Sequence, residues 1–441
     1  MKRILASLAF VGLAAGAFAQ AAPAPAAPTF TWNGYVSTGV SVVGNGTDKA
    51  IIGLWDDDNW GPGGRINFEG LIAQGDSGFK FQLRGDGAFL AGSAATAQGA
   101  NTSTQKSVYF KTAYAYSNFF DKVLYTQAGI INEQTSRAGG DASLRDTFTK
   151  ETPGVVFVVR PALEGVTAAL DAGLVGLSTD KTTQNLSDVN FTVGGSLVAK
   201  GLAQVKTGLL FADTTLGVAG KDATYGVGKA YVAAGLDAVP NLKLWLEGYF
   251  GGYDKGGLTS KPKSAYLGSG NDVGITILAE TAKYSFTDYD LPALTVGLKS
   301  YQYLYGGDIK ANAAGDAVAP SYFVTPWVSY ALDGGIVPKL ALTYFSGAEI
   351  LGSSYSATPQ NGKVDTVLGQ GPTLVKGDAN KIALFEIKPS VQFNVGATQS
   401  ITVVYAYDMS VGSDDVYFQD GYTASTAKSN SIFQVNYIYT F

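Results

Sequence analysis

The stretch from Ser431 to Phe441 reads S-I-F-Q-V-N-Y-I-Y-T-F and closes the sequence. Every second residue counted back from Phe441 is large and apolar or aromatic: Phe433, Val435, Tyr437, Tyr439 and Phe441. Polar residues fill the positions between them, with Ile438 as the exception. A period of two with aromatic residues on one face predicts a β-strand whose two sides meet different surroundings.

Two interpretations of this strand are open. It could be an ordinary buried strand of a soluble sheet, or the last strand of a closed barrel, where it pairs with the first strand and leaves no exposed edge. The terminal Phe441 and the alternating aromatics resemble the last strand of the outer-membrane β-barrel proteins of double-membraned bacteria. In that family this strand is the insertion signal for the barrel-assembly machinery. The resemblance therefore implies that role for the alternating residues from Phe433 to Phe441.

The first residues have the parts of a secretory signal peptide. Lys2 and Arg3 supply the positive start, Ile4–Phe18 the apolar run, and Ala17-Phe18-Ala19 a small-x-small cleavage site. We therefore expect a signal peptide at residues 1–19 and an Ala/Pro-rich periplasmic tether at residues 20–29. The transmembrane β-barrel would then span residues 30–441.

Composition excludes several classes of function. Without Lys2 and Arg3 the exported chain has 29 basic residues (31 less these two) against 36 acidic ones, which argues against a nucleic-acid partner. Cysteine and histidine are absent, so no disulfide framework forms, and the commonest metal ligand and general base are missing. No long uncharged apolar stretch follows the signal, so a membrane protein of this composition has to cross with strands.

About 18 alternating segments follow, each near the length that a tilted strand needs to cross a bilayer. They are expected at 30–43, 65–73, 79–90, 107–118, 122–131, 154–161, 166–177, 188–199, 202–211, 225–239, 242–253, 272–286, 291–305, 321–332, 339–345, 381–395, 400–411 and 429–441. The connections between them alternate between short and long. This asymmetry predicts an all-β, closed antiparallel transmembrane barrel of about 16–18 strands, with short periplasmic turns and long outer loops.

Charged residues lie opposite the apolar face of these strands, as a water-filled lumen permits. The expected pore-lining residues are Arg65, Glu69, Lys80, Arg84, Asp86, Lys111 and Arg160. Further acidic candidates for the lumen include Glu280, Glu386 and Asp408. The mixed signs indicate weak ion selectivity. The alternative is that cross-strand ion pairs only hold the wall together.

The segment between the expected fifth and sixth strands contains Arg137, Asp141, Arg145 and Asp146. In the general porins, which this architecture resembles, the loop at this position folds inward and narrows the pore. The resemblance implies a constriction loop that brings Asp141 and Asp146 opposite Arg65 and Arg84. A solvated outward loop is the alternative.

Asp56 and Asp58, in the run Asp56-Asp57-Asp58-Asn59, have part of the spacing of a calcium-binding loop. Trp60 and Asn67 stand where further oxygen ligands are required, so the sequence favours a solvated loop. We therefore expect no metal site.

Tyr301, Tyr303 and Tyr305 follow Lys299 on one side of an expected strand. Such a stripe could guide sugars along the channel. An aromatic girdle at the membrane interface, with Lys299 reaching the headgroups, is the interpretation that we favour.

These features predict an outer-membrane porin that lets small hydrophilic solutes and ions diffuse passively, without enzymatic turnover or cofactor. The alternatives are a substrate-specific channel for sugars or hydrophobic compounds and a non-conducting surface-binding or structural barrel. The expected partners are outer-membrane lipid, the barrel-assembly machinery and small hydrophilic solutes, but no nucleic acid. Trimers are common in the family that the chain resembles, so a homotrimer is a further expectation.

Overall fold

The computed structural model describes residues 27–44, 49–53, 65–86, 108–131, 152–175, 190–213, 225–251, 275–289, 291, 293–305, 316–317, 319–347, 380–413 and 428–441. Over these residues the chain forms one sheet of 20 strands. A single turn of 3-10 helix, Thr287–Tyr289, interrupts one of the connections. The described part of the chain holds no helix of the length and apolar character that a membrane span requires.

The first half of the sheet contains β1 (Thr29–Gly44), β2 (Lys49–Gly53), β3 (Arg65–Gln74), β4 (Ser77–Asp86), β5 (Tyr109–Phe119), β6 (Leu124–Ile131), β7 (Thr152–Val159), β8 (Ala162–Leu163), β9 (Val166–Val175) and β10 (Asn190–Ala199). The second half contains β11 (Ala203–Asp213), β12 (Tyr225–Leu236), β13 (Leu242–Gly251), β14 (Ile275–Ser285), β15 (Leu294–Tyr305), β16 (Ser321–Tyr330), β17 (Ile336–Ser346), β18 (Ala383–Val395), β19 (Gln399–Ser410) and β20 (Ser429–Thr440).

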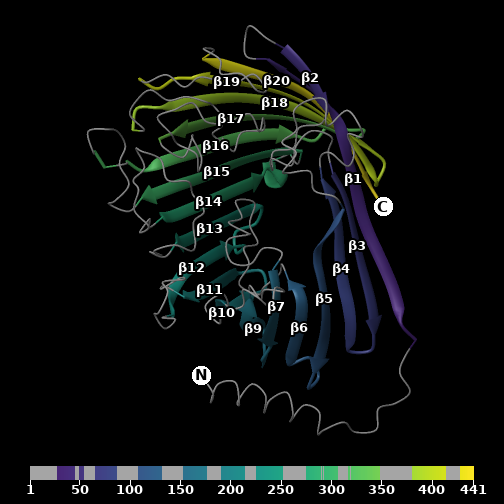
Figure 1. Ribbon diagram of the computed structural model, residues 1–441. Coiled ribbons are helices and arrows are strands. Elements are labelled where there is room, and N and C mark those ends of the chain that lie inside the picture. The colour runs from purple at the N-terminus through teal and green to yellow at the C-terminus, as the bar shows by residue number, and fades with distance from the viewer. Residues whose placement is uncertain are drawn as a thin grey trace.

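The sheet closes on itself through β1 and β20. These two strands pair antiparallel from Tyr35 opposite Thr440 to Gly44 opposite Ser431, and β1 pairs with β3 along its other edge. The five residues of β2 continue this edge of β1 beyond β3, and the two residues of β8 lie against β9. Without these two short strands the described wall is an antiparallel barrel of 18 strands. Figure 1 shows β1 beside β20 at the seam.

Short turns join the strands at one edge of the barrel. Gly75 and Asp76 alone connect β3 to β4, and Gly75 has φ +58°, the left-handed conformation that a tight hairpin turn requires. Thr29 pairs with Ala73 beside this turn, so the wall begins at the same edge. The predicted alternation of connection lengths is therefore confirmed at the turn edge.

An aromatic band covers the outside of the seam. The ring of Phe441 lies 5.5 Å from that of Trp32 and 6.5 Å from that of Phe68, measured between centroids. Phe68 continues the band to Phe81 at 6.0 Å, and Phe81 contacts Phe110 edge-on at 6.2 Å. Aromatic pairs at these separations stabilise the structure by more than the burial of their apolar area alone. The band thus joins the last strand of the barrel to the first ones.

Candidate functional site: the inner wall of the barrel

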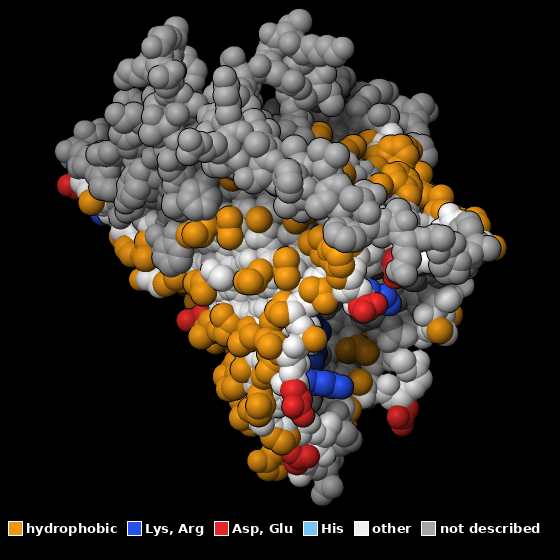
Figure 2. Space-filling view, turned by 90° about the horizontal axis from the view of Figure 1, so that it is seen from below, with side chains coloured by type: hydrophobic (Ala, Val, Ile, Leu, Met, Phe, Trp, Pro, Cys, Tyr) orange, Lys and Arg blue, Asp and Glu red, His pale blue; other side chains and the backbone are white. Residues whose placement is uncertain are grey.

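The strand register divides the side chains into an inner and an outer set. On β1 the outward side chains of Phe30 and Trp32 are each 54% exposed. Their neighbours Asn33 and Tyr35 lie opposite Glu69 and Asn67 of β3, on the inner face. The same parity carries round the barrel and places the buried charged residues of the strands on the inner face: Arg65, Arg84, Asp171, Glu247, Glu386 and Asp408. In Figure 2, which views the molecule from below, hydrophobic side chains cover the outer surface of the wall. Lys and Arg side chains lie beside the depression at its centre.

The hairpin of β3 and β4 carries a polar network on its inner face. The side-chain amide of Gln82 donates to Asn67 Oδ1 at 2.6 Å and to Glu69 Oε1 at 3.2 Å. Arg84 lies directly opposite Asn67 in the register, and Arg65 lies opposite Asp86. Both arginine side chains are buried. The structure therefore brings the predicted residues Arg65, Glu69, Lys80 and Arg84 together on one inward surface, with the backbone of Asp86 beside them.

Two predicted pore residues lie elsewhere. Lys111 stands in a β-bulge, because Gln82 pairs with Thr112 while Leu83 pairs with Phe110. Alternation does not decide the direction of a bulge residue. Arg160 follows the end of β7 at the turn edge, exposed, with its guanidinium 4.7 Å from the ring centre of Tyr125. It stands at the mouth of the barrel and not at mid-height.

Other predicted residues lie outside the described part of the chain. These are the calcium candidates Asp56 and Asp58 and the constriction residues Arg137, Asp141, Arg145 and Asp146. Among the residues that the structure does describe, no three acidic side chains come close enough to hold a metal ion.

An aromatic row crosses the inner face of β15, β16 and β17. The ring of Phe323 meets Tyr301 at 5.4 Å and Phe345 at 4.6 Å, both edge-on. Tyr303 stacks on Tyr301 at 6.2 Å, and the ammonium of Lys299 lies 5.2 Å from the Tyr301 ring centre. The girdle interpretation of this stripe is therefore wrong for Tyr301 and Tyr303, because both share the face of the buried Phe345. The side chain of Tyr305 is not described.

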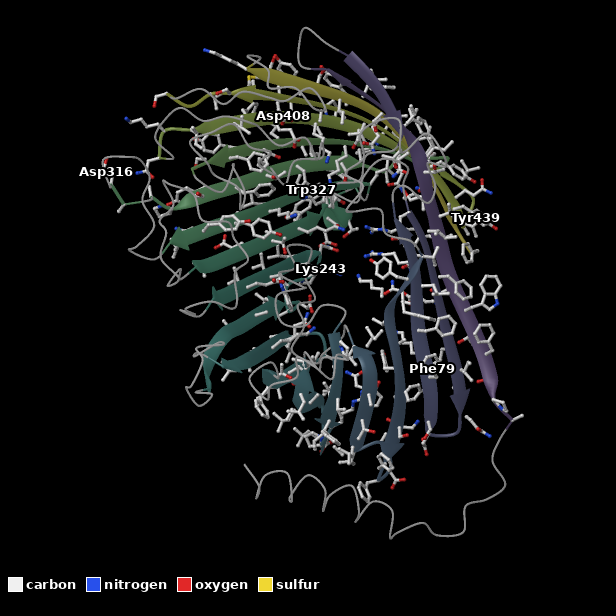
Figure 3. All side chains as sticks on the ribbon, viewed as in Figure 1. Phe79, Lys243, Asp316, Trp327, Asp408 and Tyr439 are labelled. Atoms are coloured by element: carbon white, nitrogen blue, oxygen red, sulfur yellow. The ribbon has the colours of Figure 1, made fainter. Side chains whose placement is uncertain are left out.

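Two further polar sets line the inner wall. On β13 the indole of Trp245 donates to the buried carboxylate of Glu247, and the Lys206 ammonium of β11 lies 5.8 Å from the Trp245 ring. On β17 to β19 the hydroxyl of Thr343 donates to Glu386 at 3.2 Å, and Asp408 lies opposite Glu386 in the register. Figure 3 shows Lys243, Trp327 and Asp408 on the wall and Tyr439 outside the seam.

Sequence reasoning missed an apolar part of the inner face. Tyr114, Ile131, Val156, Val158, Ala169 and Val175 form one buried cluster on β5 to β9. Gln127 of β6 lies opposite Val156 on the same face. Ile131 and Val156 are both fully buried, although their face of the strand turns into the barrel. In β7 valines stand on both faces of the strand, so no alternation of polar and apolar residues marks which face points inward. Alternation alone therefore did not reveal this patch.

Comparison with solved structures supports the fold. OpdQ of Pseudomonas aeruginosa has a TM-score of 0.50 at 10% identity, over 94% of this chain and 98% of its own. OccAB1 of Acinetobacter baumannii has a TM-score of 0.50 at 11% identity, over 93% and 96%. OmpT, an outer membrane protein of Vibrio cholerae described in a trimer form, has a TM-score of 0.43 at 10% identity, over 94% and 100%. No family model and no curated protein matches the chain. The chain thus has the fold of a porin-like outer-membrane barrel.

Proposed function

We propose that this protein is an outer-membrane porin through which small hydrophilic solutes and ions diffuse passively. The observation that carries the proposal is the inverted polarity of the wall. Charged side chains such as Arg84, Glu247 and Glu386 face inward, while large apolar side chains such as Trp32, Leu170 and Leu246 are exposed outside. Lipid on the outside and water within favour this arrangement, and a barrel of 18 strands leaves an aqueous channel.

The selectivity of such a channel comes from the charges on its wall. In this proposal the pore-lining set on β3 and β4 provides a basic surface around Arg65 and Arg84, tempered by Glu69. Glu386 and Asp408 on β18 and β19 form an acidic surface elsewhere on the wall. Because both signs are present, their fields on a permeating ion partly cancel, and selection is mainly by size.

We also propose that the segment between β6 and β7, with Arg137, Asp141, Arg145 and Asp146, narrows the channel. The buried apolar cluster supports this proposal, since two of its members lie at the strand ends next to this segment. Ile131 is the last residue of β6, and Val175 lies opposite Gly154 near the start of β7. The signal peptide at residues 1–19, delivery by the barrel-assembly machinery and association of copies in the membrane belong to the same proposal.

The test is the single-channel conductance of the detergent-refolded chain from residue 20 onward in a planar bilayer. We expect discrete, long-lived current steps and, under a salt gradient, a small reversal potential, because the wall carries both signs of charge and ion selectivity is weak. A folded barrel that inserts and never conducts would contradict the proposal and favour a structural or surface-binding role.

A substrate-specific channel is the second candidate, favoured by the aromatic row on the inner face. Rings in a channel wall bind solutes that present a flat apolar face, such as sugars. If the row has this role, the double substitution Tyr301→Ser and Phe323→Ser will remove the binding step. Uptake of a linear oligosaccharide will then rise linearly with its concentration and no longer saturate, while ion conductance remains. Liposome swelling at rising sugar concentration measures the first quantity and bilayer recording the second.

The outward substitutions Tyr322→Ser and Tyr344→Ser, on β16 and β17, are the matched control, since both side chains are exposed on the opposite face. If uptake by the unmodified protein rises linearly with sugar concentration, the protein is not a substrate-specific sugar channel.

A further inference from the structure

Two carboxylates face each other on the inner wall, toward the strand ends that lie away from the short turn between β18 and β19. Glu386 is the fourth residue of β18, and Asp408 is the third residue from the end of β19. The register places them directly opposite each other, and their side chains are only 3% and 1% exposed. In such a pair the Cβ atoms are about 5 Å apart, and like charges repel. The pair therefore needs a compensating charge.

A chain of hydroxyl groups positions the first of these carboxylates. Thr343 Oγ1 of β17 donates to Glu386 Oε1 at 3.2 Å. A hydroxyl carries one hydrogen, so Thr325 of β16 is the donor in the 3.0 Å contact between the two threonine hydroxyls. The Thr343 side chain is itself buried. The two hydroxyls thus hold the Glu386 carboxylate in place from the β17 side.

The second carboxylate has no such support. Both oxygens of Asp408 are buried, and neither accepts a hydrogen bond from any residue that the structure describes. Burial of an ionised carboxylate without a partner is strongly unfavourable. The charge of Lys388, two residues from Glu386 on the inner face, acts on Asp408, but its ammonium donates no hydrogen bond to it. A ligand from outside these side chains would complete the surroundings of Asp408.

We propose that Glu386 and Asp408 bind one calcium ion in the wall of the barrel. An ion between the two carboxylates compensates both negative charges, whereas a shared proton neutralises only one of them. Oxygen ligands alone are typical of hard cations, and the sequence has no cysteine or histidine for softer metals. Calcium accepts an irregular set of oxygens that water completes, while magnesium requires a nearly ideal octahedron. Because both carboxylates are almost fully buried, a single ion suits the site better than an organic cation.

The bound ion would change the selectivity of the channel, and this part of the inference rests on the proposed function. At about 3.3 Å per residue, Glu386 and Asp408 lie roughly 7–10 Å from the ends of their strands, so ions from the long-loop side can reach them. Calcium cancels the acidic surface of β18 and β19. The basic surface around Arg65 and Arg84 then favours anions.

Equilibrium dialysis of the detergent-refolded chain against radioactive calcium tests the binding itself. We expect one bound ion per chain. Glu386→Gln and Asp408→Asn will each weaken its binding at least about tenfold, because each removes a charged ligand. Both amides keep the size of the side chain, and heat-modifiable migration checks that each variant folds.

Glu247→Gln is the matched control for the calcium measurement. Its carboxylate is as buried on the inner face as that of Glu386, but it lies opposite Ala233 and Ala279 and not opposite a second carboxylate. This variant will bind calcium like the unmodified protein. No binding at millimolar calcium, binding that Glu386→Gln and Asp408→Asn both retain, or an equal loss in Glu247→Gln would overturn the proposal.

Bilayer recording separates this site from the channel. We expect millimolar calcium to shift the reversal potential of the unmodified protein toward anion selectivity, and to shift that of Asp408→Asn much less. A barrel that conducts but binds no calcium would overturn the calcium site alone. A barrel that binds calcium through Glu386 and Asp408 but never conducts would support the site and contradict the proposed channel.

Discussion

Replacing Arg65 and Arg84 by glutamate will make the channel prefer cations. The two side chains lie on the inner face of β3 and β4, and the double substitution changes the wall charge there by four units. A unit charge about 6 Å from an ion changes its energy by about 1 kcal/mol at an effective dielectric constant near 60. Even with screening by salt, we expect the cation-to-anion permeability ratio to rise at least about tenfold. The reversal potential under a salt gradient measures it.

Lys122→Glu with Lys200→Glu is the matched control for this experiment. These lysines are exposed in the turns after β5 and β10, and their replacement makes the same change in net charge away from the polar network. The control will leave the permeability ratio close to that of the unmodified protein. Equal shifts in both double variants would mean that Arg65 and Arg84 exert no local field on the permeating ion.

The strands were predictable because each one separates lipid from the barrel interior, which imposes alternation along its whole length. The hairpin expected at 65–73 and 79–90 is β3 and β4, with the predicted charges on one face. The terminal stretch is β20, and its alternating residues from Phe433 to Phe441 share the outer face with Trp32. The role of these residues of the last strand as an insertion signal stays a prediction.

The direction of individual side chains was less predictable where a strand has mixed polarity on both faces. In β14, Glu280 and Lys283 are three residues apart, so they lie on opposite faces, and the sequence does not say which one faces inward. The cross-strand register does: Lys283 lies opposite the inward Lys243, and Glu280 opposite the exposed Leu246. A local pattern fixes which residues share a face, and only long-range pairing fixes which face it is.

The aromatic stripe illustrates the same limit. Tyr301 and Tyr303 satisfy the aromatic pattern of an interface girdle equally well on either face. Lys299 shares their parity, and its ammonium lies over the rings of Tyr301 and Phe323 inside the barrel. Bulges add a second limit, because the register shift at Gln82 and Leu83 leaves the direction of Lys111 undetermined by counting. No property of a single strand encodes these shifts.

Gly34→Leu will prevent closure of the barrel. The backbone amide of Gly34 donates to the carbonyl of Phe441 at 3.0 Å, and the amide of Phe441 donates back to Gly34 at the same distance. A Cβ at position 34 would lie 2.2 Å from the backbone oxygen of Asn67 and 2.8 Å from the Phe441 ring. The side chain would therefore push the last strand and β3 away from β1 together.

Because an unclosed barrel leaves two strand edges without hydrogen bonds in the membrane, we expect the folded yield of Gly34→Leu to fall at least about tenfold. The fraction of heat-modifiable, protease-resistant barrel after refolding into vesicles measures it. Val40→Leu is the control: it adds a methylene to an exposed outward side chain of the same strand and will fold normally. If Gly34→Leu folds as well as Val40→Leu, the pairing of Gly34 with Phe441 does not close the wall. The aromatic band from Phe441 to Phe110 would then be the element that holds the seam, and Phe68→Ala would become the more damaging change.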